Sequence, residues 1–355
     1  FHGYPSEQYD VLMEDGYILS LYQIPHGKGD TGQSGSRSPM LIVHGFSLYG
    51  SDWVDNLSSI SLGFILAGVG YDVWIGNSQG NSWSHWHLIP SIDQEEFWDF
   101  SFHELAMYDL PAMVGFILRQ TRQEKLFYVG HAQGNSLGLI AFSSMPHLAG
   151  KIKLFFALAP LYTFHHVKGA TLKIAFLPDV MLKAIFGTKQ LTPVGRKERA
   201  TLAKTCSNLL TAEVCENEIF HIGRYNKKNL NMSQLAVYLA HFPDYTSVKT
   251  LLRWGQTAKP EEFKKFDYGE KNQEKYNEAT PSLYRIEDMT VPTTLWSGWE
   301  DWVNPPPETQ HSLPHITNLD RQEHFPNWKR FDHHWGRDAP QCMYRQMVAL
   351  MEQNP

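Results

Sequence analysis

Long apolar runs are absent from this chain of 355 residues. The longest candidates, residues 62–75 and 152–164, are interrupted by Asp72 and Pro160. Neither approaches the roughly 18–20 apolar residues that a membrane span needs, so we expect no transmembrane segment. The first five residues also lack the basic start and apolar stretch of a signal peptide, and we expect a mature, already processed chain.

Positive charge and cysteine are scarce as well. The chain has 31 Lys and Arg against 37 Asp and Glu, a formal net charge of −6, and no basic stripe, which argues against a nucleic-acid partner. With Cys206, Cys215 and Cys342 alone, one disulfide with a free thiol and three buried thiols are both open. Asn56 and Asn231 each begin an Asn-x-Ser triplet, the acceptor pattern for N-linked glycosylation, and we expect a glycan at both. Together with the cysteine pair, these triplets favour a secreted protein.

Aromatic side chains, by contrast, are abundant, with 11 Trp, 16 Tyr and 20 Phe. The simpler interpretation is a large hydrophobic core, which the hydrophobic content of 42% would amply fill. The other interpretation is an aromatic-lined pocket for an apolar ligand.

Short apolar runs, with helical segments between several of them, predict an α/β fold with a mostly parallel sheet. Asp15-Gly16 is a hairpin signal between partly alternating segments at 9–13 and 17–24. The capping-box pattern from Ser101 to Glu104 begins a helix that we expect to continue to about residue 121, with a possible kink at Pro111. The expected buried strands are residues 40–43, 71–75, 126–129, 154–158 and 293–296.

The pattern changes between residues 164 and 287. Helical periodicity persists at 171–186 and 197–211, but short buried strands are missing. We interpret this segment as a helical cap, or lid, inserted into a core formed by residues 1–163 and 288–355.

Residues 126–136 have the layout of a nucleophile elbow, which is a strand, a Gly-x-x-x-Gly turn and a helix running to about residue 144. In serine hydrolases the central position of that turn is Ser, but here it is Ala132. Alanine has no oxygen with which to attack a carbonyl.

A second segment, Gly76-Asn77-Ser78-Gln79-Gly80, matches Gly-x-Ser-x-Gly letter for letter. It follows an apolar strand, but the residues after it carry no helix signal and run to Pro90. Because an elbow needs the following helix, we do not expect Ser78 to be a nucleophile.

Further ordered motifs run through the chain: Gly3-Tyr4-Pro5, Glu14-Asp15-Gly16-Tyr17-Ile18-Leu19, His44-Gly45, Gly70-Tyr71-Asp72-Val73-Trp74, Gly76-Asn77-Ser78 with Gly80-Asn81, Tyr108-Asp109-Leu110-Pro111-Ala112, Tyr128-Val129-Gly130-His131, Ala157-Leu158-Ala159-Pro160 and Asp338-Ala339-Pro340. With these motifs the chain resembles the mammalian acid lipases, the gastric and lysosomal family, over nearly its whole length. The resemblance implies an α/β-hydrolase fold with a helical cap and lid, secretion or lysosomal delivery, and glycosylation.

The resemblance also assigns the family's catalytic triad to positions of this chain. The nucleophile falls on Ala132, the acid on Asp301 and the histidine on Arg330. Changes at two distant positions favour a natural origin over an engineered Ser-to-Ala trap. His324 or His333 could be considered as a substitute base, but a base alone does not restore acyl transfer without a nucleophile. From these changes we expect no catalytic residue set to be intact and the chain not to be an enzyme.

The oxyanion hole uses backbone N–H groups, which the resemblance places at Phe46 and Gln133. Because backbone donors do not depend on the side chains, we expect this chain to keep the oxyanion hole. Arg330 is a permanent cation with two possible roles. It either forms an ion pair with Asp301 or faces the cleft, where it would bind an anion such as a fatty-acid carboxylate.

By the same resemblance, Cys206 and Cys215 match the family's disulfide and Asn231 matches one of its glycosylation positions. Cys342 is additional, and we expect a buried small side chain there. We expect neither a cofactor nor a metal, because the adjacent pairs His165-His166 and His333-His334 would not face one way on a helix.

The first functional hypothesis is therefore a secreted, inactive lipase-like glycoprotein that binds an apolar small molecule, such as a fatty acid, a lipid ester or an odorant-like lipid, in the former active-site cleft. A lysosomal location is the alternative. The second hypothesis is a triacylglycerol or carboxylic-ester lipase that works through other residues or is an engineered form. The third is binding of a protein partner at the surface, with a vestigial cleft.

Overall fold

A mostly parallel sheet forms the centre of the molecule. The computed structural model describes residues 2–31, 35–191, 196–206 and 226–355. Within these residues the strand order is β1-β2-β4-β3-β6-β7-β10-β11, with β5 paired to β2, and every pair from β4 to β11 is parallel. The strands are β1 (Glu7–Leu12), β2 (Tyr17–Ile24), β3 (Pro39–Val43), β4 (Asp72–Gly76), β5 (Trp86–His87), β6 (Leu126–His131), β7 (Ile152–Leu158), β10 (Thr293–Gly298) and β11 (Leu319–Phe325).

The predicted hairpin and buried strands are confirmed. β1 and β2 pair antiparallel on either side of Asp15-Gly16, and Gly16 has a φ of 91°, a value that glycine adopts without steric cost. β3, β4 and β6 are buried at every position, as expected for strands covered on both faces. β11 was not predicted, because its residues are mostly polar and partly exposed at the edge of the sheet.

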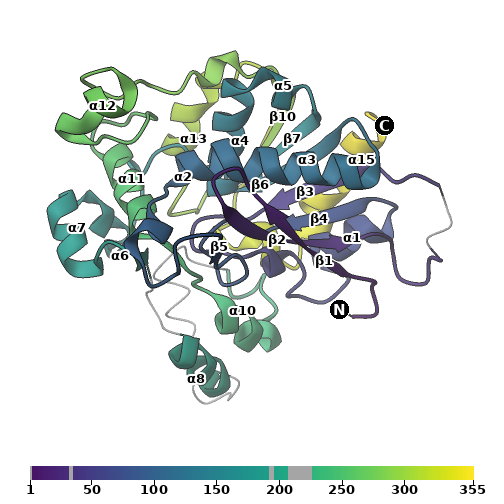
Figure 1. Cartoon of the computed structure of the whole chain (residues 1–355). Coiled ribbons are helices and arrows are strands. Elements are labelled where there is room, and N and C mark those ends of the chain that lie inside the picture. The colour runs from purple at the N-terminus through teal and green to yellow at the C-terminus, as the bar shows by residue number, and fades with distance from the viewer. Residues whose placement is uncertain (1, 32–34, 192–195, 207–225) are drawn as a thin grey trace.

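Helices cover both faces of the sheet (Figure 1). α3 (Leu110–Thr121) and α4 (Gln133–Ser144) pack on one face, while α1 (Leu62–Gly68) and α15 (Arg345–Glu352) pack on the other. This is the α/β-hydrolase architecture. The remaining core helices are α2 (Phe102–Glu104), α5 (Pro146–Ala149), α13 (Pro306–Ser312) and α14 (Asp332–Trp335).

The helix predicted from Ser101 to about residue 121 is confirmed, capping box included. It contains a π-helical segment, Leu105–Asp109, directly before Pro111. Pro111 is the second residue of α3, directly after this π segment, so the irregular turn lies where proline cannot donate the usual helix hydrogen bond. Asp109 is buried in the π segment and accepts a hydrogen bond from the backbone N–H of Gln79 at 3.0 Å, which ties this helix to the turn after β4.

The segment between β7 and β10 adds no strand to the large sheet in its described part. We keep the name cap for residues 164–287. The helix expected over 171–186 is divided at Pro178, and a two-residue pair, β8 (Gln190–Leu191) with β9 (Thr246–Ser247), lies between the helices. The cap helices are α6 (Ala170–Lys173), α7 (Asp179–Phe186), α8 (Arg196–Cys206), α10 (Leu235–His241), α11 (Val248–Ala258) and α12 (Asn272–Tyr276).

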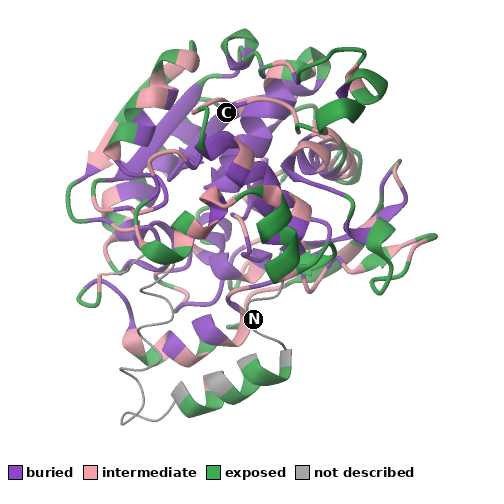
Figure 2. Ribbon diagram, turned by 90° about the vertical axis from the view of Figure 1, so that its left-hand side faces the viewer, coloured by how far each residue is buried: buried purple, intermediate pink, exposed green. Residues whose placement is uncertain are grey.

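Burial differs sharply between the sheet and the outer cap helices (Figure 2). α11 is the exception in the cap, because most of its residues are buried, among them Leu252 and Trp254. It thereby anchors the cap to the core. No helix in the described ranges is long and apolar enough to cross a membrane.

Gly255 lets α11 approach the cap segment before α7 unusually closely. A Cβ at this position would lie 2.4 Å from the backbone oxygen of Ala175, so the backbone would have to move. We expect Gly255→Ala to lower the free energy of unfolding by about 1–3 kcal/mol, although alanine is the better helix former. Urea unfolding would measure this. Gly115→Ala in α3 is the control: its Cβ would meet the end of the flexible Arg119 side chain at 3.1 Å, and we expect no loss of stability.

Candidate active site

The turn after β6 has the geometry of a nucleophile elbow. Ala132 has φ 51° and ψ −111°, a strained combination for a residue with a side chain, and α4 begins at the next residue. A Cβ on Gly134 would lie 2.5 Å from the carbonyl oxygen of Val43, and one on Gly130 would lie 2.6 Å from Oδ1 of Asn135. The flanking glycines are therefore required by close packing, and the elbow presents a methyl group where serine hydrolases present a hydroxyl.

Ser78 is not in such a turn. Ser78 does not have a positive φ, no helix begins directly after it, and its side chain is buried. Its backbone N–H donates to Nε2 of His44 at 3.1 Å, while Nδ1 of His44 lies 2.8 Å from the carbonyl oxygen of Gly45. Ser78 and His44 thus shape the loops beside the elbow, and the sequence-based exclusion of Ser78 as a nucleophile agrees with this geometry.

Asp301 and Arg330 are both buried near the elbow. Oδ1 of Asp301 accepts the backbone N–H groups of Val303 at 2.8 Å and Asn304 at 3.2 Å, and its Oδ2 has no hydrogen-bond partner among the residues that the structure describes. Burial raises the pKa of Asp301, and the nearby Arg330 opposes that shift. Burial lowers the pKa of Arg330, which the Asp301 carboxylate in turn opposes.

No Arg330–Asp301 ion pair within 4.0 Å is present among the described side chains, and Nη1 of Arg330 has no hydrogen-bond partner. Arg330 instead contributes to the wall of a cavity. Of the two roles considered from the sequence, the geometry therefore favours the cation facing the cleft.

The cavity has a volume of about 670 Å³ and lies between the elbow side of the core and the cap. Core residues Phe46, Leu161 and Val303 line it together with cap residues Phe186 and Leu251. Arg330 and Lys173 are the charged side chains among its described lining residues. It is an apolar pocket with few polar groups, as small-molecule sites commonly are.

Of the two proposed oxyanion donors, Phe46 lies in the cavity wall and Gln133 directly follows the elbow residue Ala132. Gln133 is also the first residue of α4, where helix N–H groups have no partner within the helix. No acceptor in the described ranges takes the backbone N–H of either residue. These N–H groups remain our prediction for the oxyanion hole.

A contact that sequence analysis missed joins the cap to the elbow. Nε1 of Trp254, on α11, donates to Oε1 of Gln133 at 2.8 Å, and both side chains are buried. Trp254 also stacks on Phe164 with ring centroids 5.2 Å apart. The two bonded residues are 121 positions apart, and no local pattern marks such a pair.

The histidines near the elbow do not replace the missing base. His131, His333 and His334 are buried, the rings of His333 and His334 have no hydrogen-bond partner in the described part, and none of the three lines the cavity. Burial lowers the pKa of all three, that of His333 to about 3. His324 lies on the edge strand β11 and contacts Oγ of Ser297.

The structure describes both asparagines predicted to carry glycans, Asn56 and Asn231, and Cys342, but not Cys215. Asn56 is 1% exposed and its Nδ2 donates to the carbonyl oxygen of Trp335 at 3.3 Å, an arrangement that argues against a glycan on this nitrogen in the folded chain. Asn231 is 8% exposed, and glycosylation at this residue stays a prediction. Cys215 lies outside the described residues, so the predicted disulfide with Cys206 also stays one. Cys342 is half-buried and packs on the core.

Comparisons with known proteins agree with the fold and the motifs. Residues 38–337 match the family described as "alpha/beta hydrolase fold", and residues 1–57 match a "Partial alpha/beta-hydrolase lipase region". The chain is 46% identical to lipase member M of Mus musculus over 99% of this chain and 84% of that protein. It is 43% identical to the lysosomal acid lipase/cholesteryl ester hydrolase of Homo sapiens (99% and 88% covered) and to the gastric triacylglycerol lipase of Bos taurus (100% and 90%). An esterase from Exiguobacterium antarcticum shares the fold, with a TM-score of 0.54 and 12% identity over 98% of this chain and 100% of that one.

These similarities correct one expectation. The residues at positions 132 and 330 led us to predict that the chain is not an enzyme, and that prediction is contradicted. Relatives 43% identical to this chain over essentially its whole length are named as acid and gastric lipases, so the lipase class, which was our alternative, fits the chain better.

Proposed function

Because the chain belongs to the α/β-hydrolase family of acid lipases, we propose that it binds a fatty acid or a lipid carboxylic ester in the cavity beneath the cap. The observation that carries this proposal is the apolar cavity of about 670 Å³ with Arg330 in its wall. The acyl chain would lie along the apolar lining. The carboxyl end would lie at the core end, near Arg330 and the N–H groups of Phe46 and Gln133.

The energetics of the cavity suit such a ligand. Each CH₂ group moved from water into an apolar site contributes about 0.8 kcal/mol, so a long acyl chain gains most of its affinity from the lining. A buried guanidinium without a close ion pair is costly, and a ligand carboxylate would offset that cost. Arg330 thus selects for a negatively charged or strongly polar head group.

The test compares a fluorescent fatty acid with its methyl ester. Arg330→Met should weaken binding of the acid by about tenfold to a hundredfold, the effect of losing a charged hydrogen bond, and leave binding of the methyl ester nearly unchanged. Arg345→Met, on the exposed side of α15, is the control. Equal affinity of the unmodified chain and Arg330→Met for the acid would contradict the proposed head-group site.

Ester hydrolysis is the second candidate function, and the relatives' names favour it. Because residue 132 offers a methyl group, hydrolysis by this chain would use water or another side chain as the nucleophile. Release of free fatty acid from triacylglycerol and cholesteryl ester by the purified chain, measured at acid and neutral pH, tests this candidate. By analogy with the relatives, we propose a secreted or lysosomal location, with a glycan at Asn231.

A further inference from the structure

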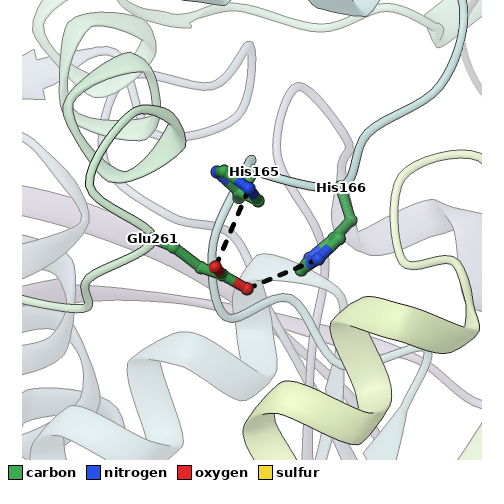
Figure 3. A group of neighbouring side chains, drawn as sticks. All are labelled: His165, His166 and Glu261. Carbon is green, nitrogen blue, oxygen red and sulfur yellow. Dashed lines mark ion pairs between the residues drawn. The ribbon is translucent and has the colours of Figure 1, made fainter.

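A cluster of histidine and glutamate side chains lies where the cap meets the core, away from the elbow. His165 and His166 are on the turn that leads from β7 to α6, and Glu261 follows α11 (Figure 3). Nε2 of His165 lies 3.7 Å from Oε2 of Glu261, and Nε2 of His166 lies 3.4 Å from its Oε1. The sequence argument against a metal assumed that adjacent histidines lie on a helix, but on this turn both rings converge on one carboxylate.

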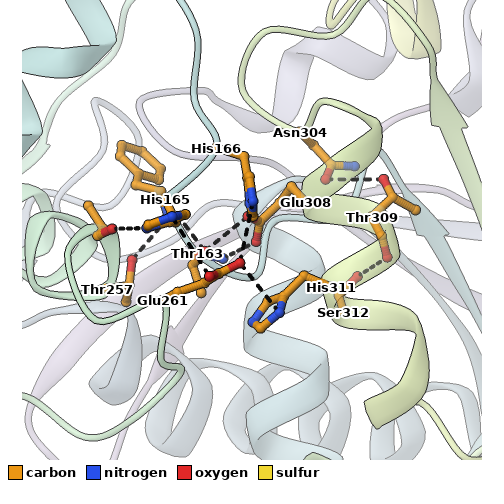
Figure 4. Close-up of polar contacts among 12 residues, drawn as sticks. Thr163, His165, His166, Thr257, Glu261, Asn304, Glu308, Thr309, His311 and Ser312 are labelled. Carbon is orange, nitrogen blue, oxygen red and sulfur yellow. Dashed lines mark hydrogen bonds and ion pairs between the residues drawn. The ribbon is translucent and has the colours of Figure 1, made fainter.

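The second nitrogen of each ring is held by an acceptor. Nδ1 of His165 lies 2.6 Å from the carbonyl oxygen of Ala258, and Nδ1 of His166 lies 2.9 Å from Oε2 of Glu308 (Figure 4). Because a carbonyl or carboxylate oxygen only accepts hydrogen bonds, each Nδ1 carries the proton. Nε2 of each ring is then left to face Glu261, where it either donates a proton to the carboxylate or, once deprotonated, offers its lone pair to a metal ion. Metal-binding histidines are oriented by this type of contact.

Glu308 is a firmly held support for His166. Its side chain is fully buried on α13, where it accepts from both the hydroxyl and the backbone N–H of Thr163. A buried carboxylate bonded to the rear nitrogen of a histidine fixes the ring and raises its basicity. The four side chains of the cluster itself, including His311, are only partly exposed, so the arrangement is built into the protein and still reachable from solvent.

The ligand atoms of His165, His166 and Glu261 all lie within 4.8 Å of one another, and His311, beside Glu261, is the candidate for a fourth ligand. Its Nδ1 lies 3.5 Å from Oε1 of Glu261. Zinc bonds of about 2.0–2.2 Å to nitrogen and oxygen give distances of about 3.3–3.6 Å between neighbouring ligands of a tetrahedron. The distances from Oε1 of Glu261 to His166 and His311, 3.4 and 3.5 Å, lie in that range, and His165 lies 3.7 Å from the other oxygen, Oε2.

We propose that His165, His166, Glu261 and His311 bind a zinc ion. Three imidazole nitrogens and one carboxylate are a typical zinc ligand set, whereas Mg²⁺ and Ca²⁺ prefer oxygen ligands alone. The site is separate from the lipid cavity, and it does not depend on what the cavity binds.

The ion would join three separate parts of the chain. His165 and His166 belong to the start of the cap, Glu261 to the segment after α11, and His311 to the core helix α13. Phe164, next to His165, lines the lipid cavity, as does Leu251 on α11. Bound zinc therefore links the cap to the core beside the cavity wall. It stabilises the folded chain, because the unfolded chain does not hold the four ligands together.

The experiment uses the whole purified chain, stripped with a chelator and dialysed. Titration calorimetry with zinc chloride, metal analysis after gel filtration, and the visible spectrum of the Co²⁺-loaded chain measure the binding. We expect one zinc per chain, a rise in Tm on zinc addition, and a Co²⁺ spectrum typical of four-coordinate sites. Mg²⁺ at the same concentration should do none of these.

Two variants and one control locate the site. Glu261→Gln and His311→Ala should each weaken zinc binding at least about tenfold and abolish the rise in Tm. Both leave the His166–Glu308 contact intact, so they should fold as the unmodified chain does, which circular dichroism without metal would show. His147→Ala removes an exposed histidine elsewhere and should bind zinc normally. A chain that takes up no zinc, or variants that bind it as tightly as the unmodified chain, would overturn the proposal.

Discussion

The double substitution Ala132→Ser with Arg330→His is expected to yield a chain that is acylated by esters at residue 132. The elbow already holds this position at φ 51°, between β6 and the N-terminus of α4. Oδ2 of Asp301 accepts no hydrogen bond within the described part of the chain and could accept the Nδ1–H of a histidine at position 330. That histidine would take the proton of the serine hydroxyl as its oxygen attacks the ester carbonyl.

The expected size of this effect is large. Loss of the nucleophile or the base in a serine protease costs on the order of 10⁶ in kcat, and the oxyanion hole and binding alone retain about 10³–10⁴ over water. We expect the double variant to exceed the unmodified chain in ester turnover by on the order of 10³ or more. A fluorophosphonate probe followed by peptide mass spectrometry should find the adduct on Ser at position 132.

The single substitutions are the controls for this experiment. Ala132→Ser alone provides a hydroxyl without a base, and Arg330→His alone provides a base without a hydroxyl, so each should gain far less than the pair. If the double variant folds normally but forms no adduct at residue 132, then the assignment of Asp301 and position 330 to the triad is wrong.

The central fold could be predicted from the sequence because its signals are local. β3, β4 and β6 are continuous apolar runs, and the hairpin and the capping box depend on residues within a few positions of each other. The elbow was recognisable even with alanine at its centre, because Gly130 and Gly134 are needed for backbone approach whatever the side chain at 132 does. β11 was missed, since its partly exposed polar residues carry no periodic apolar pattern.

Contacts between distant segments could not be predicted in this way. The Trp254–Gln133 bond depends on how α11 crosses the elbow, and the convergence of His165 and His166 on Glu261 depends on a turn that no motif specifies. The burial of Asn56 is a similar case: its triplet fits a sequon, but the side chain is enclosed by residues near Trp335, 279 positions away. The role of Arg330 likewise required the cavity, because the sequence by itself favours an ion pair with Asp301.

Buried carboxyl groups should make the stability of this chain depend strongly on pH. Burial raises the pKa of Asp55 and of Asp332 from 3.8 to about 7, and it raises that of Asp52 beside Asp55 well above its ordinary value. A group whose pKa is raised by folding contributes stability that is complete below its unfolded pKa and is lost as the pH rises through the folded pKa. For Asp55 and Asp332 that window extends from about pH 4 to about pH 7.

Buried histidines oppose this trend in part of the range. Burial lowers the pKa of His44 to about 4 and that of His333 to about 3, from 6.5. The stability that these two histidines contribute is complete above pH 6.5 and is lost as the pH falls. In mildly acidic solution this loss partly cancels the stability that the carboxyl groups gain as the pH falls. Above about pH 6.5 the histidines are neutral in the folded and in the unfolded chain, so the carboxyl groups alone make the free energy of unfolding depend on pH. We therefore expect the free energy of unfolding to change little between pH 5 and 6.5 and to fall at higher pH.

Asp55→Asn isolates one of these carboxyl groups. Asp55 is 8% exposed and its Oδ2 has no partner among the described residues, so asparagine removes the ionisation while keeping the shape. A difference of about three pKa units corresponds to about 4 kcal/mol. The effect of Asp55→Asn on the free energy of unfolding should therefore become more favourable by up to about that amount between pH 4 and pH 8. Urea unfolding across this range would measure it, with Asp320→Asn on the exposed side of β11 as the control. An Asp55→Asn effect that is the same at every pH would mean that Asp55 is ionised in the folded chain throughout, and that its burial is compensated by groups around it.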